Sequence, residues 1–182
     1  VYSPDDRVNG EKYIFFSLAA LELARQLNWQ PDILHAHDWH TAIAVYRLCQ
    51  NRLVDPFFQN TRSLLTIHNL PYLGGDATEI LAEYGIPPTQ NRSLPAWARS
   101  FPLPLGLLAA DKISAVSPSY AREILTPEFG CGLQDFLATR QQDIHGILTA
   151  LTLPHGTRPL IRVSPGPTPS THWTSAGPTK PP

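Results

Sequence analysis

The stretch HAHDWH, residues 35–40, places three histidines, an aspartate and a tryptophan within six positions. Imidazole and carboxylate groups can bind zinc, move protons at a reacting centre, or hydrogen-bond the hydroxyl groups of a sugar. Further along the chain, TIHN places His68 beside Asn69, and Tyr72 follows shortly afterwards. These two short segments are the first candidates for a functional site.

The spacing within HAHDWH argues against a metal site. On a strand His35 and His37 would share one face, whereas Asp38 and His40 would lie beyond the strand end. The chain has no HExxH motif and no closely spaced cysteine pair that would complete a familiar zinc site. We therefore predict no metal, and we expect His35 to satisfy polar groups at the strand end. Trp39 is expected in the core or in the wall of a crevice.

Other catalytic motifs are missing from the sequence. Ser117 has no GxSxG around it, and there is no Walker lysine motif and no GxGxxG. Ser117 followed by Pro118 predicts a helix start, with serine as the N-cap and proline in the first turn. The pair Gly74–Gly75 predicts a turn, although it could also let backbone amides approach a phosphate.

The periodicity of apolar residues predicts alternating helices and strands. We expect strands over 32–37 (a buried strand), 62–68, 112–117 and from 143, and helices over 11–28, 41–50, 119–125 and 133–141, with a helix end at 105–111. Between 76 and 104 we expect short helix and irregular connections. This order is typical of an α/β fold, a Rossmann-like parallel sheet with flanking helices.

Polar residues recur where the predicted strands end. Asp38 follows the first strand, and His68 and Asn69 follow the second. In open parallel sheets, ligands bind in the crevice beyond the carboxyl ends of the strands. We therefore expect a crevice lined by these residues and Tyr72, able to hold a polyol or a nucleotide sugar.

Composition excludes several classes of protein. The chain has 182 residues, 42% of them hydrophobic, and a formal net charge of −1. These values are typical of a globular domain and favour neither a nucleic-acid partner nor a membrane. The two cysteines form no framework, which favours a reducing compartment, and we expect a cytoplasmic protein, or a plastid protein if the source is a plant.

Three blocks taken together resemble bacterial glycogen synthases and plant starch synthases. They are PDILHAHDWHTA, LLTIHNLPYLGG and AADKISAVSPSYAREILTPEFGCGL, in the order and at the spacing found in that family. The resemblance covers about Tyr2 to Leu148 and implies part of the N-terminal catalytic domain of a two-domain GT-B glycosyltransferase. The implied reaction transfers glucose from ADP-glucose to the non-reducing end of an α-1,4-glucan, with retention and without metal or cofactor.

The resemblance also implies roles for individual residues. Asp38 and His68 would be catalytic, with His68 facing the donor glucose and Asp38 contacting the sugar or orienting the cleft. Asn69 and Tyr72 would bind substrate from the same loop. Trp39 and His40 match the motif and are expected to bind substrate as well.

The family pattern contains parts that these 182 residues do not show. A lysine–glycine–glycine loop that contacts donor phosphate precedes the matched region in the family, and a C-terminal domain supplies the arginine, lysine and glutamate that hold ADP-glucose. We therefore expect residues 1–148 to be an incomplete, inactive and marginally stable part of the catalytic domain. The alternatives are a non-catalytic glucan-binding remnant, another nucleotide-sugar glycosyltransferase and, more remotely, a metal-dependent hydrolase.

Residues 149–182 differ in character from the rest of the chain. They contain eight prolines and no aspartate or glutamate. Where the family expects Asn-Gly-Ile-Asp after GIL, this chain has Thr-Ala-Leu-Thr, and a one-base shift of suitable codons restores the family residues. The same shift allows Trp-Asp-Pro-x-x-Asp to be read across residues 155–161. We therefore predict an out-of-frame tail, with a genuine Pro-rich disordered tail as the alternative.

Overall fold

The computed structural model describes residues 2–148, so the predictions for 149–182 lie outside the described residues. Its helices are α1 (Asp6–Gln26), α2 (Asp38–Asn51), α3 (Thr78–Glu83), α4 (Pro102–Ala109), α5 (Pro118–Glu123) and α6 (Gln134–Thr139). Its strands are β1 (Ile33–His37), β2 (Arg62–Ile67), β3 (Lys112–Ala115) and β4 (Ile144–Gly146). Short 3-10 turns span Pro56–Phe58, Ala96–Ser100 and Gln141–Asp143.

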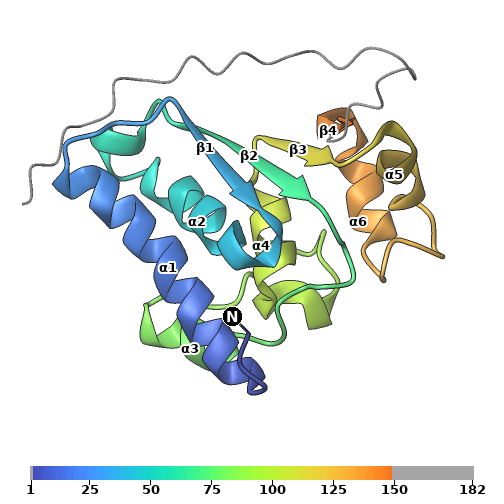
Figure 1. Ribbon diagram of the computed structural model, residues 1–182, viewed down its shortest axis with the longest axis horizontal. Coiled ribbons are helices and arrows are strands. Elements are labelled where there is room, and N and C mark those ends of the chain that lie inside the picture. Colours follow the sequence, from blue (N-terminus) through green and yellow to red (C-terminus); the bar gives the residue numbers. More distant parts are fainter. Residues whose placement is uncertain (1, 149–182) are drawn as a thin grey trace, which may run out of the picture. The chain divides into compact units, whose positions relative to one another are not determined.

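The four strands form one parallel sheet in the order β1-β2-β3-β4 (Figure 1). Each crossover between neighbouring strands contains helix, as parallel pairing requires. The predicted α/β fold, a parallel sheet with flanking helices, is confirmed. Because all strands run the same way, their carboxyl ends meet at one edge of the sheet.

Two helices begin earlier than the sequence predicts. Helix α1 begins at Asp6 rather than Glu11, because the Asp5 side chain accepts the backbone N–H of Arg7 and caps the helix. Helix α2 begins at Asp38 rather than Thr41, directly after β1. The predicted cap at Ser117 is confirmed, since its hydroxyl accepts the N–H of Tyr120 at 3.0 Å. Among residues 2–148, no helix has both the length and the apolar content to cross a membrane.

One face of the sheet is packed against helices. The strands contribute alternate apolar residues, and α2 and α4, which pack against each other, supply the opposing side chains. This core contains the buried residues Ala36, Leu65, Ile67, Ile113, Ala115, Ala42, Val45, Leu103 and Leu107. A second cluster, which includes Ile14, Ile43, Leu81 and Leu105, joins α1 and α3 to the same helices.

The opposite face of the sheet is polar. Residues His35 and His37 of β1 lie on it, and the register places Thr66 and Ser114 alongside. The prediction that 32–37 is a buried strand is wrong, because Ile33 is 61% exposed and only Ala36 is buried. β1 lies at the edge of this sheet with a single neighbouring strand, so its side chains are covered less than those of β2.

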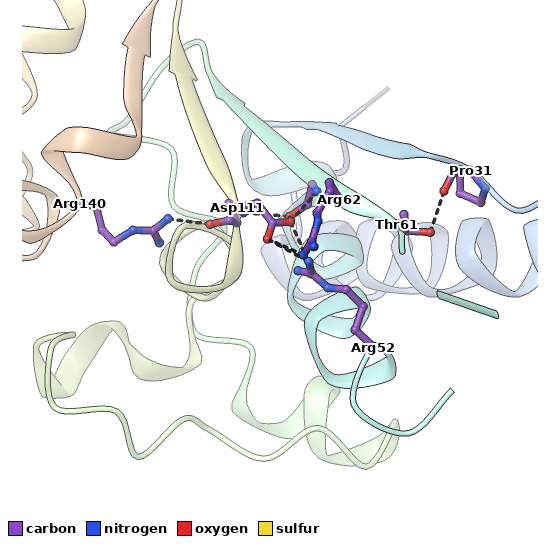
Figure 2. A network of polar contacts seen from close by, with 8 residues as sticks. Pro31, Arg52, Thr61, Arg62, Asp111 and Arg140 are labelled. Atoms are coloured by element: carbon purple, nitrogen blue, oxygen red, sulfur yellow. Dashed lines mark hydrogen bonds and ion pairs between the residues drawn. The ribbon is translucent and has the colours of Figure 1, made fainter. Parts of the chain in front are cut away.

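Polar contacts also join β2 and β3 at the end of the sheet where these strands begin (Figure 2). The Asp111 carboxylate accepts two hydrogen bonds from Arg52, each 2.9 Å, and also the N–H of Ser63 at 2.7 Å. Arg140 donates to the carbonyl of Ala110 at 2.6 Å. Fixing the beginnings of β2 and β3 in this way also fixes where their carboxyl ends stand.

Candidate functional site

The junction between β1 and α2 is the centre of the site. Asp38 has a φ of 50°, a left-handed conformation that is uncommon for residues other than glycine, asparagine and aspartate. The Thr41 hydroxyl accepts the N–H of His37 at 2.6 Å and donates to its carbonyl at 2.9 Å, which closes the turn. Backbone strain of this kind gathers at functional sites. The chain therefore passes from strand to helix without a connecting loop and presents Asp38 at the sheet edge.

The loop after β2 is anchored at several points. Asp38 Oδ1 accepts the backbone N–H of His68 at 2.7 Å and that of Asn69 at 3.3 Å. Further on, the N–H of Leu70 donates to the hydroxyl of Tyr120 at 2.8 Å, and Leu70 itself is buried. The two segments singled out in the sequence are thus joined by direct hydrogen bonds.

A cleft of about 810 Å³ opens beside this junction. Five of the six predicted site residues line it: Asp38, Trp39, His40, Asn69 and Tyr72. The remaining wall comes from the N-terminal part of the chain and from the loop after β2, namely Tyr2, Ser3, Asp6, Asn9, Pro71, Leu73, Gly74 and Gly75. The predicted crevice at the carboxyl ends of the first two strands is therefore present in the structure.

Trp39 serves both the core and the cleft wall. Its side chain is 7% exposed and meets the ring of Tyr13 edge-on at 5.0 Å between centroids. Gly74, with a φ of 94°, lies so close that a Cβ there would be 2.7 Å from the Trp39 ring. Residues 72–77 are irregular and form no turn, so the predicted turn at Gly74–Gly75 is not confirmed, although both glycines have positive φ. Glycine is needed at 74 both for its backbone conformation and for this close approach.

His40 is held in an aromatic surrounding. Its ring stacks on Trp39 with centroids 4.5 Å apart, and Nε2 hydrogen-bonds the hydroxyl of Tyr2. Burial lowers the pKa of His40 below its usual value, and nearby Lys12 acts in the same direction, while Asp38 opposes them. The neutral imidazole is therefore favoured at neutral pH, so His40 contributes hydrogen-bonding groups but no charge to the cleft wall.

His68 is the predicted site residue that does not line this cleft. Its Nε2 instead lies 3.0 Å from His37 Nδ1, on the polar side of the strand ends. The sequence interpretation did not include His37 among the site residues. The sequence could have predicted that His37 lies near His68, because alternation along β1 and β2 places residues 37, 66 and 68 on one face of the sheet.

The charge of the cleft restricts what it can bind. Its lining contains the carboxylates of Asp6 and Asp38 but no lysine or arginine. Aromatic rings and neutral hydrogen-bonding groups suit the faces and hydroxyls of a sugar, whereas a pyrophosphate needs cationic or amide partners. Within residues 2–148, no group of three or more histidine, cysteine, aspartate or glutamate side chains is arranged to hold a metal ion.

A parallel α/β sheet with a cleft at the carboxyl ends of its first two strands is the arrangement of an α/β ligand-binding domain. The chain matches the starch synthase catalytic domain family over residues 1–139. It belongs to this family, whose members are glycosyltransferases.

Named relatives agree with this assignment. The chain is 38% identical to the glycogen synthase of Bacillus subtilis over 146 residues and 38% identical to that of Vibrio cholerae over 143 residues. These matches cover 79% and 77% of this chain but only 30% and 29% of the relatives. The chain therefore spans about a third of the length of the curated relatives that it matches.

A solved structure shows the same fold. The catalytic domain of starch synthase IV from Arabidopsis thaliana, determined with ADP and acarbose bound, matches with a TM-score of 0.67 and 29% identity. The match covers 81% of this chain and 30% of that one.

Proposed function

We propose that residues 1–148 form the acceptor- and sugar-contacting part of a glycogen or starch synthase site. The proposed reaction is the retaining transfer of glucose from ADP-glucose to the non-reducing end of an α-1,4-glucan. The observation that carries the proposal is the cleft itself, in which Asp38, Asn69 and Tyr72 converge beside Trp39 in a member of the starch synthase family. Such a reaction would place the protein in a bacterial cytoplasm or a plastid.

Each residue is assigned a role by its position. Trp39 and Tyr72 offer apolar surface to a sugar ring, and Asn69 and His40 offer hydrogen bonds to hydroxyl groups. Asp38 holds the loop that carries His68 and Asn69, and we propose that it also meets a sugar hydroxyl through its carboxylate. For His68 we propose contact with the donor glucose through Nδ1, because its Nε2 is engaged by His37.

The cleft favours binding without transfer when these 182 residues act alone. ADP leaves with a concentrated negative charge, and the cleft lining provides no lysine or arginine to stabilise it. The glucan-binding alternative is therefore the behaviour expected of the isolated chain. The 182-residue chain should bind maltoheptaose weakly and incorporate no glucose from ADP-glucose.

A segment exchange tests the enzymatic part of the proposal. Residues 1–148 replace the matching segment of the Bacillus subtilis glycogen synthase, which then supplies the rest of the protein. Glucose incorporation from ADP-glucose into glycogen is measured for the hybrid and for the hybrid with Asp38→Ala. We expect incorporation by the hybrid and a loss of at least about 100-fold in the variant, the loss typical of a removed transition-state contact.

Two outcomes of the segment exchange would contradict the proposal. A hybrid that folds and binds glucan but incorporates no glucose from ADP-glucose would contradict the proposed reaction. Full activity of the Asp38→Ala hybrid would remove Asp38 from the proposed site. Tyr84→Phe serves as a matched control, because Tyr84 lies outside the cleft lining and its loss should leave transfer unchanged.

A further inference from the structure

Three histidine rings lie in a row at the carboxyl ends of β1 and β2. The ring of His37 lies between the other two, with centroids 4.3 Å from His35 and 5.3 Å from His68. His37 Nδ1 and His68 Nε2 are 3.0 Å apart, within hydrogen-bond distance. Within residues 2–148, no hydrogen bond forms at His68 Nδ1, which leaves that nitrogen available to a ligand.

A hydrogen bond between two imidazoles determines the protonation of both. One nitrogen must carry the proton and the other must present its lone pair, so one ring donates and the other accepts. Each neutral histidine has a single N–H, so the two tautomers are coupled: when His37 Nδ1 donates, His68 carries its proton on Nδ1, and when His68 Nε2 donates, His37 carries its proton on Nε2. Protonating both rings would place two N–H groups against each other and break the contact.

We infer that His37 is a positioning residue, which holds the His68 ring in one orientation, with Nδ1 free for a bound sugar, and couples the tautomer of His68 to its own. This inference rests on the proposed function for the part of His68 in catalysis, but the contact itself does not depend on any ligand. The arrangement resembles the way in which a second hydrogen bond orients a metal-binding or catalytic histidine.

His37 is itself held in place. Its neighbour His35 is bonded through Nε2 to the Thr66 hydroxyl at 2.7 Å, and Thr66 in turn bonds the Ser114 hydroxyl at 2.6 Å. Thr66 and Ser114 are both buried, so this row is anchored to β2 and β3. The backbone of His37 is fixed by Thr41, as described above. The ring that meets His68 therefore has support from the sheet beneath it.

The charges around His37 favour its neutral form. Partial burial lowers the pKa of His37 below its usual value, and His35 and His68 add to this effect. Asp38 is the opposing group and raises the pKa of His37, but its effect is the smaller. The neutral form of His37 is accordingly expected at neutral pH, and because its pKa is lowered the contact should open only at a pH below the ordinary range of histidine.

The test uses the full 182-residue chain with ¹⁵N-labelled histidine. Two-bond ¹H–¹⁵N spectra report which imidazole nitrogens carry protons, from pH 5.5 to 8. In the natural chain we expect complementary protonation, in which only one of His68 Nε2 and His37 Nδ1 carries a proton. His37→Phe keeps a ring but removes both nitrogens, and it should shift the tautomer populations of His68. His37→Gln can still donate to or accept from Nε2 and should shift those populations less than His37→Phe does.

His145→Phe is the matched control, because His145 lies on β4, two strands away from β2. It should leave the tautomer of His68 unchanged. The inference is overturned if His68 Nε2 and His37 Nδ1 are both protonated or both unprotonated at neutral pH in the natural chain, or if the tautomer populations of His68 are unchanged in His37→Phe. The natural-chain spectrum decides the first point even if a variant does not fold. Absence of maltoheptaose binding would count against the proposed function and would leave these spectra unaffected.

Discussion

Asp38 and His68 are joined by a 2.7 Å hydrogen bond from the backbone N–H of His68 to the carboxylate of Asp38. This bond links the first residue of α2 to the first residue after β2, so it couples the two motifs that define the site. Because Asn69 donates to the same oxygen at 3.3 Å, one carboxylate orients the start of the whole loop.

Replacing Asp38 should weaken the fold as well as the site. Asp38→Ala loses an ionised acceptor for two N–H groups and places alanine at a φ of 50°, for a combined loss of about 2–3 kcal/mol in the free energy of unfolding. Asp38→Gly loses the same bonds without the left-handed penalty and should be about 1 kcal/mol more stable than Asp38→Ala. Urea unfolding measures the difference, and equal stability of the two variants would contradict the backbone argument.

The two adjacent glycines offer a second comparison. Gly74 and Gly75 both have positive φ, at 94° and 68°, so alanine at either position should cost about 1–2 kcal/mol. A Cβ at Gly75 would meet nothing within 4 Å, whereas at Gly74 it would reach the Trp39 ring. Gly74→Ala should therefore lose about 1–3 kcal/mol more and shift the tryptophan fluorescence. Thermal unfolding and emission spectra measure both, and similar results for the pair would contradict the close packing.

The sequence predicted the element order and five residues of the cleft lining because local patterns carry that information. Alternation and apolar periodicity placed four strands and their helices, and the strand-end rule brought Asp38 and Asn69 together with Tyr72 in one cleft. Helix starts were less accurate. The start of α2 depends on a left-handed aspartate and a threonine bond at the end of β1, and neither has a periodic signature.

Contacts across the sheet were the harder part to predict. The pairing of His37 with His68 follows from the register of β1 on β2, which joins His37 to Thr66 and is set by the fold as a whole. Burial of β1 was overestimated for the same reason, since apolar content does not reveal that a strand lies at the sheet edge. The motif likewise did not reveal that Asp38 accepts hydrogen bonds from two backbone N–H groups.

Sequencing the gene tests the out-of-frame proposal for residues 149–182. We expect the codons after Leu148 to encode Asn-Gly-Ile-Asp when shifted by one base, followed by Trp-Asp-Pro-x-x-Asp. The family match ends at residue 139 and the tail has no acidic residue, which supports the proposal. Codons that encode neither motif in any frame would leave a genuine Pro-rich segment as the explanation.

Asp111 should govern part of the stability in acid. Burial would raise its pKa, but hydrogen bonds from Arg52 and Ser63 outweigh burial and hold the pKa of Asp111 below its ordinary value of 3.8. A carboxylate with a lowered pKa stabilises the fold above its ordinary pKa, and this contribution is lost as the pH falls below about 4. Asp111→Asn should therefore be less stable at pH 7 and should show a weaker loss of stability between about pH 4 and 2.

At pH 7, removing Asp111 should lower the free energy of unfolding more than removing one partner of an ordinary surface ion pair. Asp111→Ala leaves the N–H of Ser63 and the largely buried Arg52 without their acceptor, so we expect a loss of about 2 kcal/mol in the free energy of unfolding. Glu11→Gln is the matched control, because the Arg7–Glu11 pair is about half exposed and should contribute far less to stability than Asp111 does. Urea unfolding at pH 7 and at pH 3 measures all three variants. If Glu11→Gln proved as costly as Asp111→Ala, or if Asp111→Asn kept the acid dependence of the natural chain, the strand-start network would not have the role assigned to it.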